Sequence, residues 1–170
     1  MFLIGSLVVY SGTGVCRVEA VGPPPFDPGS KVEYYTLIPL QSTGTIYVPV
    51  DTKVFMRPIL SREAAQELIR RIPEIQQAQL EHLDYRMLAQ RYRSFLDSHS
   101  CEDLVQLIKT AYAKSRANTR RGKKPSKVDQ DFQKRAEFLL HDELSAALDI
   151  PFDEVGDYIT QQVEQMKQTG

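Results

Sequence analysis

The chain has no tryptophan, two cysteines and three histidines among 170 residues, and its formal net charge is only −1. Cys16 and Cys101 lie far apart in regions of different composition, which favours reduced thiols over a disulfide framework. His82, His99 and His141 show none of the close spacings that metal sites use. The near-neutral net charge excludes a globally basic protein, so only the distribution of charge can indicate a nucleic-acid partner.

Long apolar runs are missing as well. No stretch approaches eighteen consecutive apolar residues, and the apolar N-terminus lacks a basic flank and is interrupted at Gly5 and Ser6. We therefore expect neither a membrane-spanning helix nor a secretory signal. The expected location is the cytoplasm, with no membrane partner.

Catalytic motifs are scarce. Gly12 and Gly14 precede a strand-like segment and not a helix, so they do not form a phosphate-binding loop. Cys16 has no paired histidine and is expected to be a small core residue. We predict that the chain is not an enzyme and has no metal, cofactor or small-molecule substrate. The order of residues in an HD-type phosphohydrolase is matched only formally, by His82 or His99, His141-Asp142 and Asp157.

The first sixty residues are the part that is rich in β-branched and aromatic residues. The turn Ser11-Gly12-Thr13-Gly14 predicts a hairpin, because its glycines accept positive φ without steric cost. Short strands with no room for helical crossovers predict an antiparallel sheet that curls on itself. The strand-like segments are residues 8–10, 15–21, 32–40 and 45–50.

From residue 61 the periodicity becomes helical. Ser61, Ser100 and Ser126 are predicted N-caps, and Pro73 is predicted to end the first helix. We predict an α+β fold with two domains, a small β domain over 1–60 and a compact helical bundle over 61–170. The predicted helices are 62–72, which bridges the domains within 61–73, then 74–96, one after Ser100, one after Ser126 and one from Pro151.

If residues 45–50 form an outer strand, its unpaired backbone groups would be a template for a strand of another chain. Alternation puts Ile46 and Val48 on one face and Tyr47 on the other. Pro49 lacks an amide hydrogen and would stop the pairing. The alternative is that the aliphatic residues are simply core and Tyr47 is an ordinary half-exposed aromatic residue.

Residues 104–128 contain eight basic side chains and no acidic one. Such a cluster neutralises phosphates without reading bases, so we interpret it as a sequence-neutral surface for nucleic acid. Charge alone also allows a flexible, soluble connection around residues 120–125. The eight are Lys109, Lys114, Arg116, Arg120, Arg121, Lys123, Lys124 and Lys127.

An ordered set of motifs in the first sixty residues resembles the CarD/CdnL family of bacterial transcription regulators. The matching residues are Phe2, Gly5, Val8, Val9 and Tyr10 of F-x-x-G-x-x-V-V-Y, Gly14, Val15 and Val18 of G-V-x-x-V, Tyr34-Tyr35, Val48-Pro49-Val50 and Arg57-Pro58. The resemblance implies a Tudor-like or SH3-like β-barrel, shared with a module of the transcription-repair coupling factor, that docks on the RNA polymerase β subunit. It also implies a helical domain that contacts promoter DNA, although only the helix layout matches over residues 85–165.

The same resemblance implies where the polymerase would be bound. Relatives carry docking arginines at the positions matching Tyr47 and Pro24, and neither residue is basic here. The implied polymerase-binding residues are Tyr35, Ile46, Tyr47, Val48 and Pro49.

Family members also use a tryptophan that wedges into the minor groove at the upstream edge of the melted promoter. The helix layout puts Tyr85 at that position, with Leu83 as an alternative, and an aromatic ring can hold unstacked DNA. Tyr85 could instead pack between helices, and the arginines after it could pair with Glu81 and Asp84. The expected phosphate contacts on this helix are Arg86, Arg91 and Arg93.

These features together predict a CarD-like, non-enzymatic regulator. It would bind the polymerase β subunit and stabilise the open promoter complex through sequence-neutral DNA contacts at the upstream fork. The alternative is a protein-interaction module with a Tudor-like barrel and no role on DNA.

Overall fold

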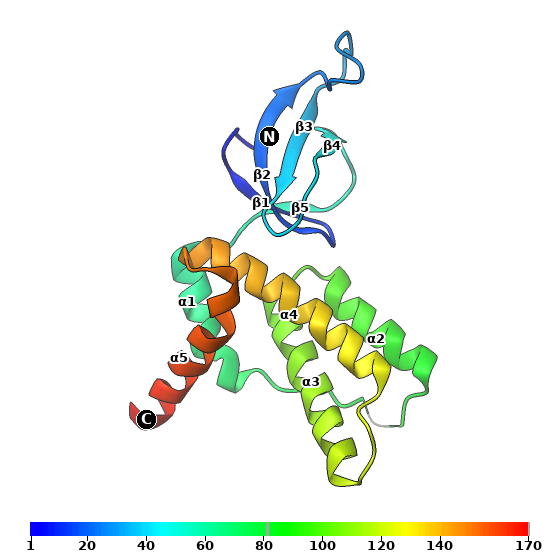
Figure 1. Cartoon of the computed structure of the whole chain (residues 1–170), viewed down its shortest axis with the longest axis vertical. Helices are drawn as coiled ribbons and strands as arrows, with labels where there is room; N and C mark the ends of the chain where they lie inside the picture. Colours follow the sequence, from blue (N-terminus) through cyan, green and yellow to red (C-terminus); the bar gives the residue numbers. More distant parts are fainter. Residues whose placement is uncertain (81, 170) are drawn as a thin grey trace.

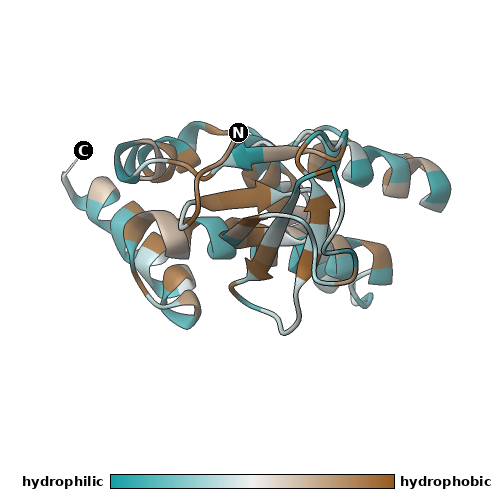
Figure 2. Cartoon of the chain, turned by 90° about the horizontal axis from the view of Figure 1, so that it is seen from above, coloured by the Kyte–Doolittle hydropathy of each residue, from teal (hydrophilic) through white to brown (hydrophobic). Residues whose placement is uncertain are grey.

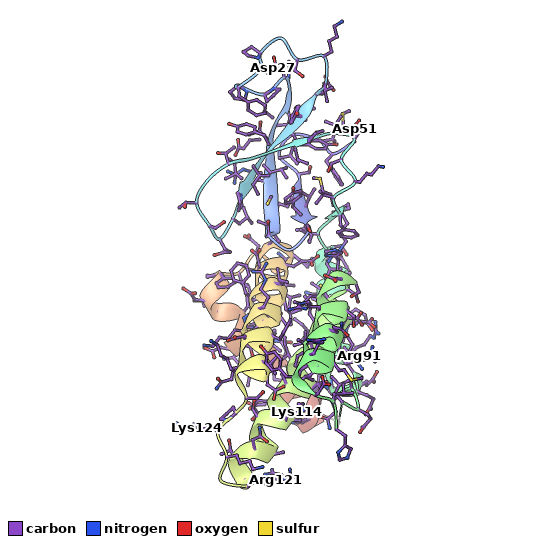
Figure 3. The ribbon with its side chains drawn as sticks, turned by 90° about the vertical axis from the view of Figure 1, so that its right-hand side faces the viewer. Asp27, Asp51, Arg91, Lys114, Arg121 and Lys124 are labelled. Atoms are coloured by element: carbon purple, nitrogen blue, oxygen red, sulfur yellow. The ribbon has the colours of Figure 1, made fainter. Side chains whose placement is uncertain are left out.

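An antiparallel β-sheet occupies one end of the elongated molecule, and helices make up the rest (Figures 1 and 3). The computed structural model describes residues 1–80 and 82–169, and within these ranges it contains five strands and five α-helices. The predicted α+β class and the order of sheet before helices are therefore confirmed. None of the helices described is both long and apolar enough to cross a membrane.

The sheet has the strand order β4-β3-β2-β1-β5, and all neighbouring strands are antiparallel. β4 and β5 do not pair with each other, so the sheet is open, although its curl is compatible with a Tudor-like barrel. Sequence reasoning missed β5, because three residues are too few to show alternation. The strands are β1 (Leu7–Tyr10), β2 (Gly14–Gly22), β3 (Tyr34–Pro39), β4 (Ile46–Pro49) and β5 (Met56–Pro58).

One face of the sheet forms a small core of its own. Figure 2 shows hydrophobic residues concentrated in the strands, whereas the helices alternate hydrophobic and hydrophilic residues. Cys16 is fully buried, as predicted for a small core residue. The buried cluster consists of Val8, Cys16, Val18, Tyr35, Leu37 and Val48.

Three of the helices begin at their predicted caps. The Oγ atoms of Ser61, Ser100 and Ser126 accept hydrogen bonds from the backbone N–H groups three residues later, at 3.0, 3.4 and 3.1 Å. These bonds satisfy donors that have no partner within the first turn of a helix. The helices are α1 (Arg62–Arg71), α2 (Tyr85–Asp97), α3 (Cys101–Arg120), α4 (Lys127–Leu148) and α5 (Val155–Thr169), with 3₁₀ turns η1 (Ile72–Glu74) and η2 (Phe152–Glu154).

The predicted helix over 74–96 is wrong in its first half. Residues 75–80 and 82–84 are not helical, and Asp84 caps α2 by accepting a 2.8 Å hydrogen bond from the Met87 N–H. The segment instead bonds to α3, where Thr110 Oγ1 accepts from the Ala78 N–H at 2.8 Å. Leu80 is buried, so its apolar character reflects packing of this irregular segment and not a helical face.

Candidate docking edge and nucleic-acid interface

Two adjacent carboxylates of α4 connect the helices to the sheet. Glu143 accepts from both terminal guanidinium nitrogens of Arg57 in β5, at 2.6 and 2.7 Å, and also accepts from the Leu60 N–H at 2.8 Å. Asp142 Oδ2 accepts from the Val15 N–H of β2 at 2.8 Å. Arg57 also donates to the His99 carbonyl at 2.9 Å, so the junction joins β2, β5, α4 and the connection before α3.

The electrostatics of this junction follow from its burial. The side chain of Glu143 is 3% exposed and that of Arg57 is 25% exposed, and the ion pair raises the pKa of the guanidinium further. Burial raises the pKa of Asp142 to about 6, and its Oδ1 has no hydrogen-bond partner among the described atoms. Burial, followed by the negative charge of Glu143, raises the pKa of the Cys101 thiol, which therefore stays protonated.

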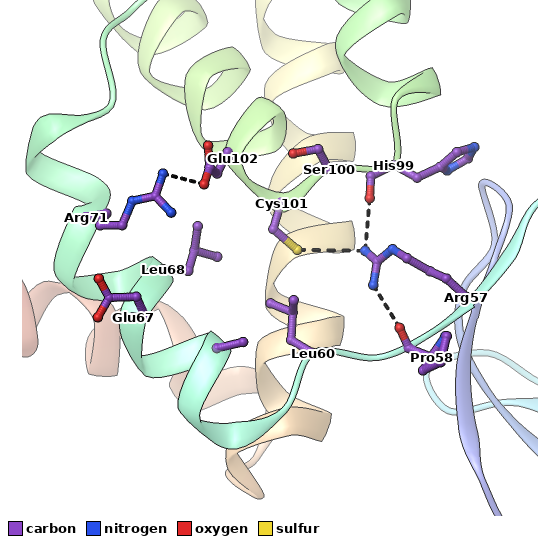
Figure 4. A pocket seen from close by; sticks show the side chains of 11 residues that line it. Arg57, Pro58, Leu60, Glu67, Leu68, Arg71, His99, Ser100, Cys101 and Glu102 are labelled. Atoms are coloured by element: carbon purple, nitrogen blue, oxygen red, sulfur yellow. Dashed lines mark hydrogen bonds and ion pairs between the residues drawn. The ribbon is translucent and has the colours of Figure 1, made fainter.

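A cavity of about 460 Å³ lies beside this junction, between β5, α1 and the start of α3 (Figure 4). Both arginines on its wall are engaged, because Arg57 pairs with Glu143 and Arg71 pairs with Glu102. Each arginine on the wall of the cavity already has a carboxylate partner, so neither is left to bind an anion.

No three His, Cys, Asp or Glu side chains of the described residues gather into a metal-ligand set. The residues of the formal HD-type pattern have other neighbours. His99 stacks on Phe55 at 4.0 Å, His141 packs edge-on against Phe152, and Asp142 faces Val15. The pattern in the sequence thus has no counterpart in the contacts.

β4 lies at an edge of the sheet, which is the condition on which the strand template of residues 45–50 depends. The Val50 N–H donates to the Glu33 carbonyl at 3.0 Å. In an antiparallel pair, every second pair of opposite residues exchanges backbone hydrogen bonds. Counting from Val50, the backbone of Val48 therefore bonds to that of Tyr35, and the backbone of Tyr47 does not bond to that of Thr36. The N–H and C=O of Tyr47 consequently point away from β3. No turn, loop or side-chain hydrogen bond in the described parts of the chain uses these two groups.

The five implied polymerase-binding residues fall into two groups. Tyr35 and Val48 are 2% and 4% exposed, and the Tyr35 hydroxyl accepts from the Phe2 N–H at 2.9 Å. Their side chains are core and not contact surface, which corrects that part of the prediction. Tyr47 is exposed, and Ile46 and Pro49 are half-buried at the edge.

An exposed aromatic residue that sequence reasoning missed lies beside this edge. Phe26, in the loop between β2 and β3, is 67% exposed and contacts both Tyr34 and Tyr47 with its ring. Pro24, at the position where relatives carry an arginine, is fully buried. A phenylalanine in a proline-rich loop was the available signal in the sequence, but its exposure and its neighbours are set only by the fold.

Basic side chains gather on the helical part of the molecule: Figure 3 shows Lys114, Arg121 and Lys124 towards the end that is far from the sheet, and Arg91 nearer the sheet. Residues 84–127 contain eleven basic and four acidic side chains, whereas residues 128–170 contain three basic and ten acidic side chains. We call the following exposed or half-buried residues the cationic end: Arg86, Arg91, Arg93, Lys114, Arg116, Arg120, Arg121, Lys123 and Lys124. None of them forms an ion pair with a carboxylate of the described residues.

Lys109 does not belong to this surface. Its Nζ donates to the carbonyls of Ile72 and Ile75, the latter at 2.8 Å, and thereby fixes the chain after α1 against α3. Burial lowers the pKa of Lys109. The prediction that it contacts DNA is therefore corrected to a structural role.

Tyr85 begins α2 and is 74% exposed, so the alternative in which it packs between helices is wrong. Leu83, the other candidate, is half-buried against the helical core. Glu81, one proposed partner of the arginines, lies outside the described residues, and Asp84 caps α2.

Comparison with known proteins adds one finding. Residues 2–60 match the family described as the CarD-like/TRCF RID domain, which covers about a third of the chain. No curated protein matches the sequence.

Proposed function

We propose, from the premise that residues 2–60 belong to the CarD-like/TRCF RID family of RNA polymerase-interacting domains, that the chain is a CarD-like transcription regulator. Its partners would be the polymerase β subunit and promoter DNA, with contacts to DNA that do not depend on sequence. An RID domain is a protein-interaction domain and not a catalytic one. The work of the protein would be done in the cytoplasm, where bacterial polymerase acts.

The observation that supports this proposal best is the separation of two surfaces in one molecule. The open edge of β4 lies in the sheet, and the cationic end lies on the helices, away from the sheet (Figure 3). A protein bound to polymerase through the first surface would hold the second at a high local concentration near DNA. Weak contacts with phosphates would then be enough to keep the cationic end bound to DNA.

The proposed division of labour follows the domains. Residues 1–60 would bind the polymerase, residues 61–170 would contact DNA, and 61–73 would bridge the two. The Arg57–Glu143 ion pair and the Asp142 contact with Val15 support a fixed orientation between them.

The proposed effect on transcription is stabilisation of the open promoter complex at its upstream fork. A ligand shifts an equilibrium only by its differential affinity for the two states, so the factor must contact opened DNA better than closed DNA. Tyr85 is suited to this, because an exposed ring can insert at an unstacked base step while neighbouring arginines bind phosphates.

A titration of forked DNA, followed by fluorescence anisotropy at several salt concentrations, tests the DNA contact. If about four cationic side chains reach phosphates, the slope of log K against log salt is expected near −4. The slope should shrink and the affinity fall in a variant with four alanine replacements, at Arg120, Arg121, Lys123 and Lys124.

The matched control removes four exposed basic residues elsewhere and should leave DNA affinity nearly unchanged. A flat salt response of the wild-type chain, or equal losses in both variants, would favour a protein-interaction module without a role on DNA. The control replacements are Lys31→Ala, Lys53→Ala, Arg62→Ala and Lys167→Ala.

A further inference from the structure

We propose that this chain contacts polymerase through an aromatic surface: Phe26, Tyr34 and Tyr47 receive an apolar side chain from an extended β-subunit segment that pairs with β4. This inference rests on the proposed docking and names its chemistry. It differs from the charge-paired docking implied by the arginines of relatives.

The three rings form one cluster. The Phe26 ring stands nearly perpendicular to Tyr34, at 5.8 Å and 86° between planes, and to Tyr47, at 5.7 Å and 82°. Edge-to-face pairs of this kind are favourable beyond the area that they bury. Phe26 is thus held in one place although two thirds of it is exposed to solvent.

The loop that carries Phe26 is itself anchored. Pro24 is fully buried, and its carbonyl accepts from the Asp27 N–H at 3.0 Å, which closes a turn around Pro25 and Phe26. A preformed turn reduces the entropy lost when a partner binds. An exposed ring on such a turn has the properties of a binding anchor.

The backbone of β4 specifies how the partner would approach. Tyr47 has its N–H and C=O directed away from β3, whereas Pro49 has no N–H and its carbonyl accepts from the Thr52 N–H at 3.0 Å. An added strand would therefore bond at Tyr47. The partner residue opposite Tyr47 would have its side chain on the same face, beside the aromatic cluster.

The chemistry of that partner side chain follows from what lines this face. Aromatic residues pair favourably with β-branched or aromatic neighbours across strands. The two arginines of residues 1–60 are engaged elsewhere, because Arg17 pairs with Glu19 at 2.6 Å and Arg57 pairs with Glu143. A valine, isoleucine or aromatic residue on the β subunit fits this surface best.

The test measures binding of the full chain to purified core polymerase without DNA. Apolar burial is not screened by salt, so Kd should change less than about twofold between about 0.1 and about 0.5 M salt. Phe26→Ala should weaken binding about tenfold, as loss of an aromatic anchor does. Phe26→Tyr should retain most of the affinity, since the ring remains.

The matched control is Val32→Ala, because Val32 is 48% exposed in the same domain but lies outside the cluster, and it should bind like wild type. Binding that falls steeply with salt, an unaffected Phe26→Ala variant, or a Tyr47→Arg variant that binds more tightly would overturn the aromatic docking while leaving polymerase docking intact. Absence of any binding by the wild-type chain would overturn the proposed function itself.

Discussion

Replacing Glu143 by glutamine is expected to destabilise the protein by about 2 to 3 kcal/mol. The amide keeps the shape of the side chain and can still accept from the Leu60 N–H. It loses the negative charge that holds the two terminal guanidinium nitrogens of Arg57 at 2.6 and 2.7 Å. The loss therefore reports on the ion pair and not on a cavity.

The magnitude follows from the exposure of the two partners. Removing one member of a fully buried pair costs about 3 to 5 kcal/mol, whereas an exposed pair contributes about 0 to 1 kcal/mol. Glu143 is buried, but the side chain of Arg57 is 25% exposed and regains some water when its partner is removed. The expected value lies between the two cases.

Urea unfolding followed by circular dichroism measures this difference, and the midpoint of thermal unfolding should fall by about 4 to 12 °C. Limited proteolysis should show faster cleavage between β5 and α1, because the ion pair holds that segment. Glu164→Gln, at an exposed position on α5, is the control.

Two outcomes would refute this reasoning. One is a loss of stability below about 0.5 kcal/mol, the size typical of an ordinary surface substitution. The other is an equal loss when Glu143→Gln is made in an Arg57→Met background, where the pair no longer exists.

Further predictions concern the same junction and Tyr85, the proposed wedge at the start of α2. Because the pKa of Asp142 is raised to about 6, above about 3.9 in an unfolded chain, its contribution to stability should fall as the pH rises from about 4 to about 6. Asp142→Asn should remove that fall and be the more stable form at pH 8 in urea unfolding; equal pH profiles would contradict this. Gly14→Ala should cost about 3 kcal/mol, because φ is +111° and the new Cβ would approach Asp142 Oδ2; an unchanged unfolding midpoint would argue against the close approach. Tyr85→Ala should shorten the lifetime of open complexes and Tyr85→Trp should lengthen it, and equal lifetimes would discard the wedge.

The edge strand shows how much of the candidate docking edge could be predicted from the sequence. Alternation was enough to place Tyr47 on the face opposite to Ile46 and Val48, because strand side chains alternate whatever the fold, but it did not show that Val48 is core. The exposure of Tyr35 could not be predicted, since it depends on the strands beside it. Phe26 was missed for the same reason: its two aromatic neighbours are brought to it by tertiary folding.

The prediction of the cationic end from the sequence was limited in the same way. Its charge segregation is visible in the sequence, because no acidic residue interrupts residues 104–128. Lys109 is part of that run, yet it binds the carbonyls of Ile72 and Ile75, which are more than thirty residues away. Charge pattern alone cannot separate a lysine with such partners from one that faces solvent.

By itself, the sequence determined the features that depend on near neighbours: the serine caps of α1, α3 and α4, the hairpin and the run of basic residues. Their physical causes act within a few residues, so they can be read locally. Tertiary structure alone decided the irregular segment before α2, the aromatic cluster and the junction. Val15 and Asp142 are 127 residues apart and Arg57 and Glu143 are 86 apart, and only folding brings such groups into hydrogen-bond distance.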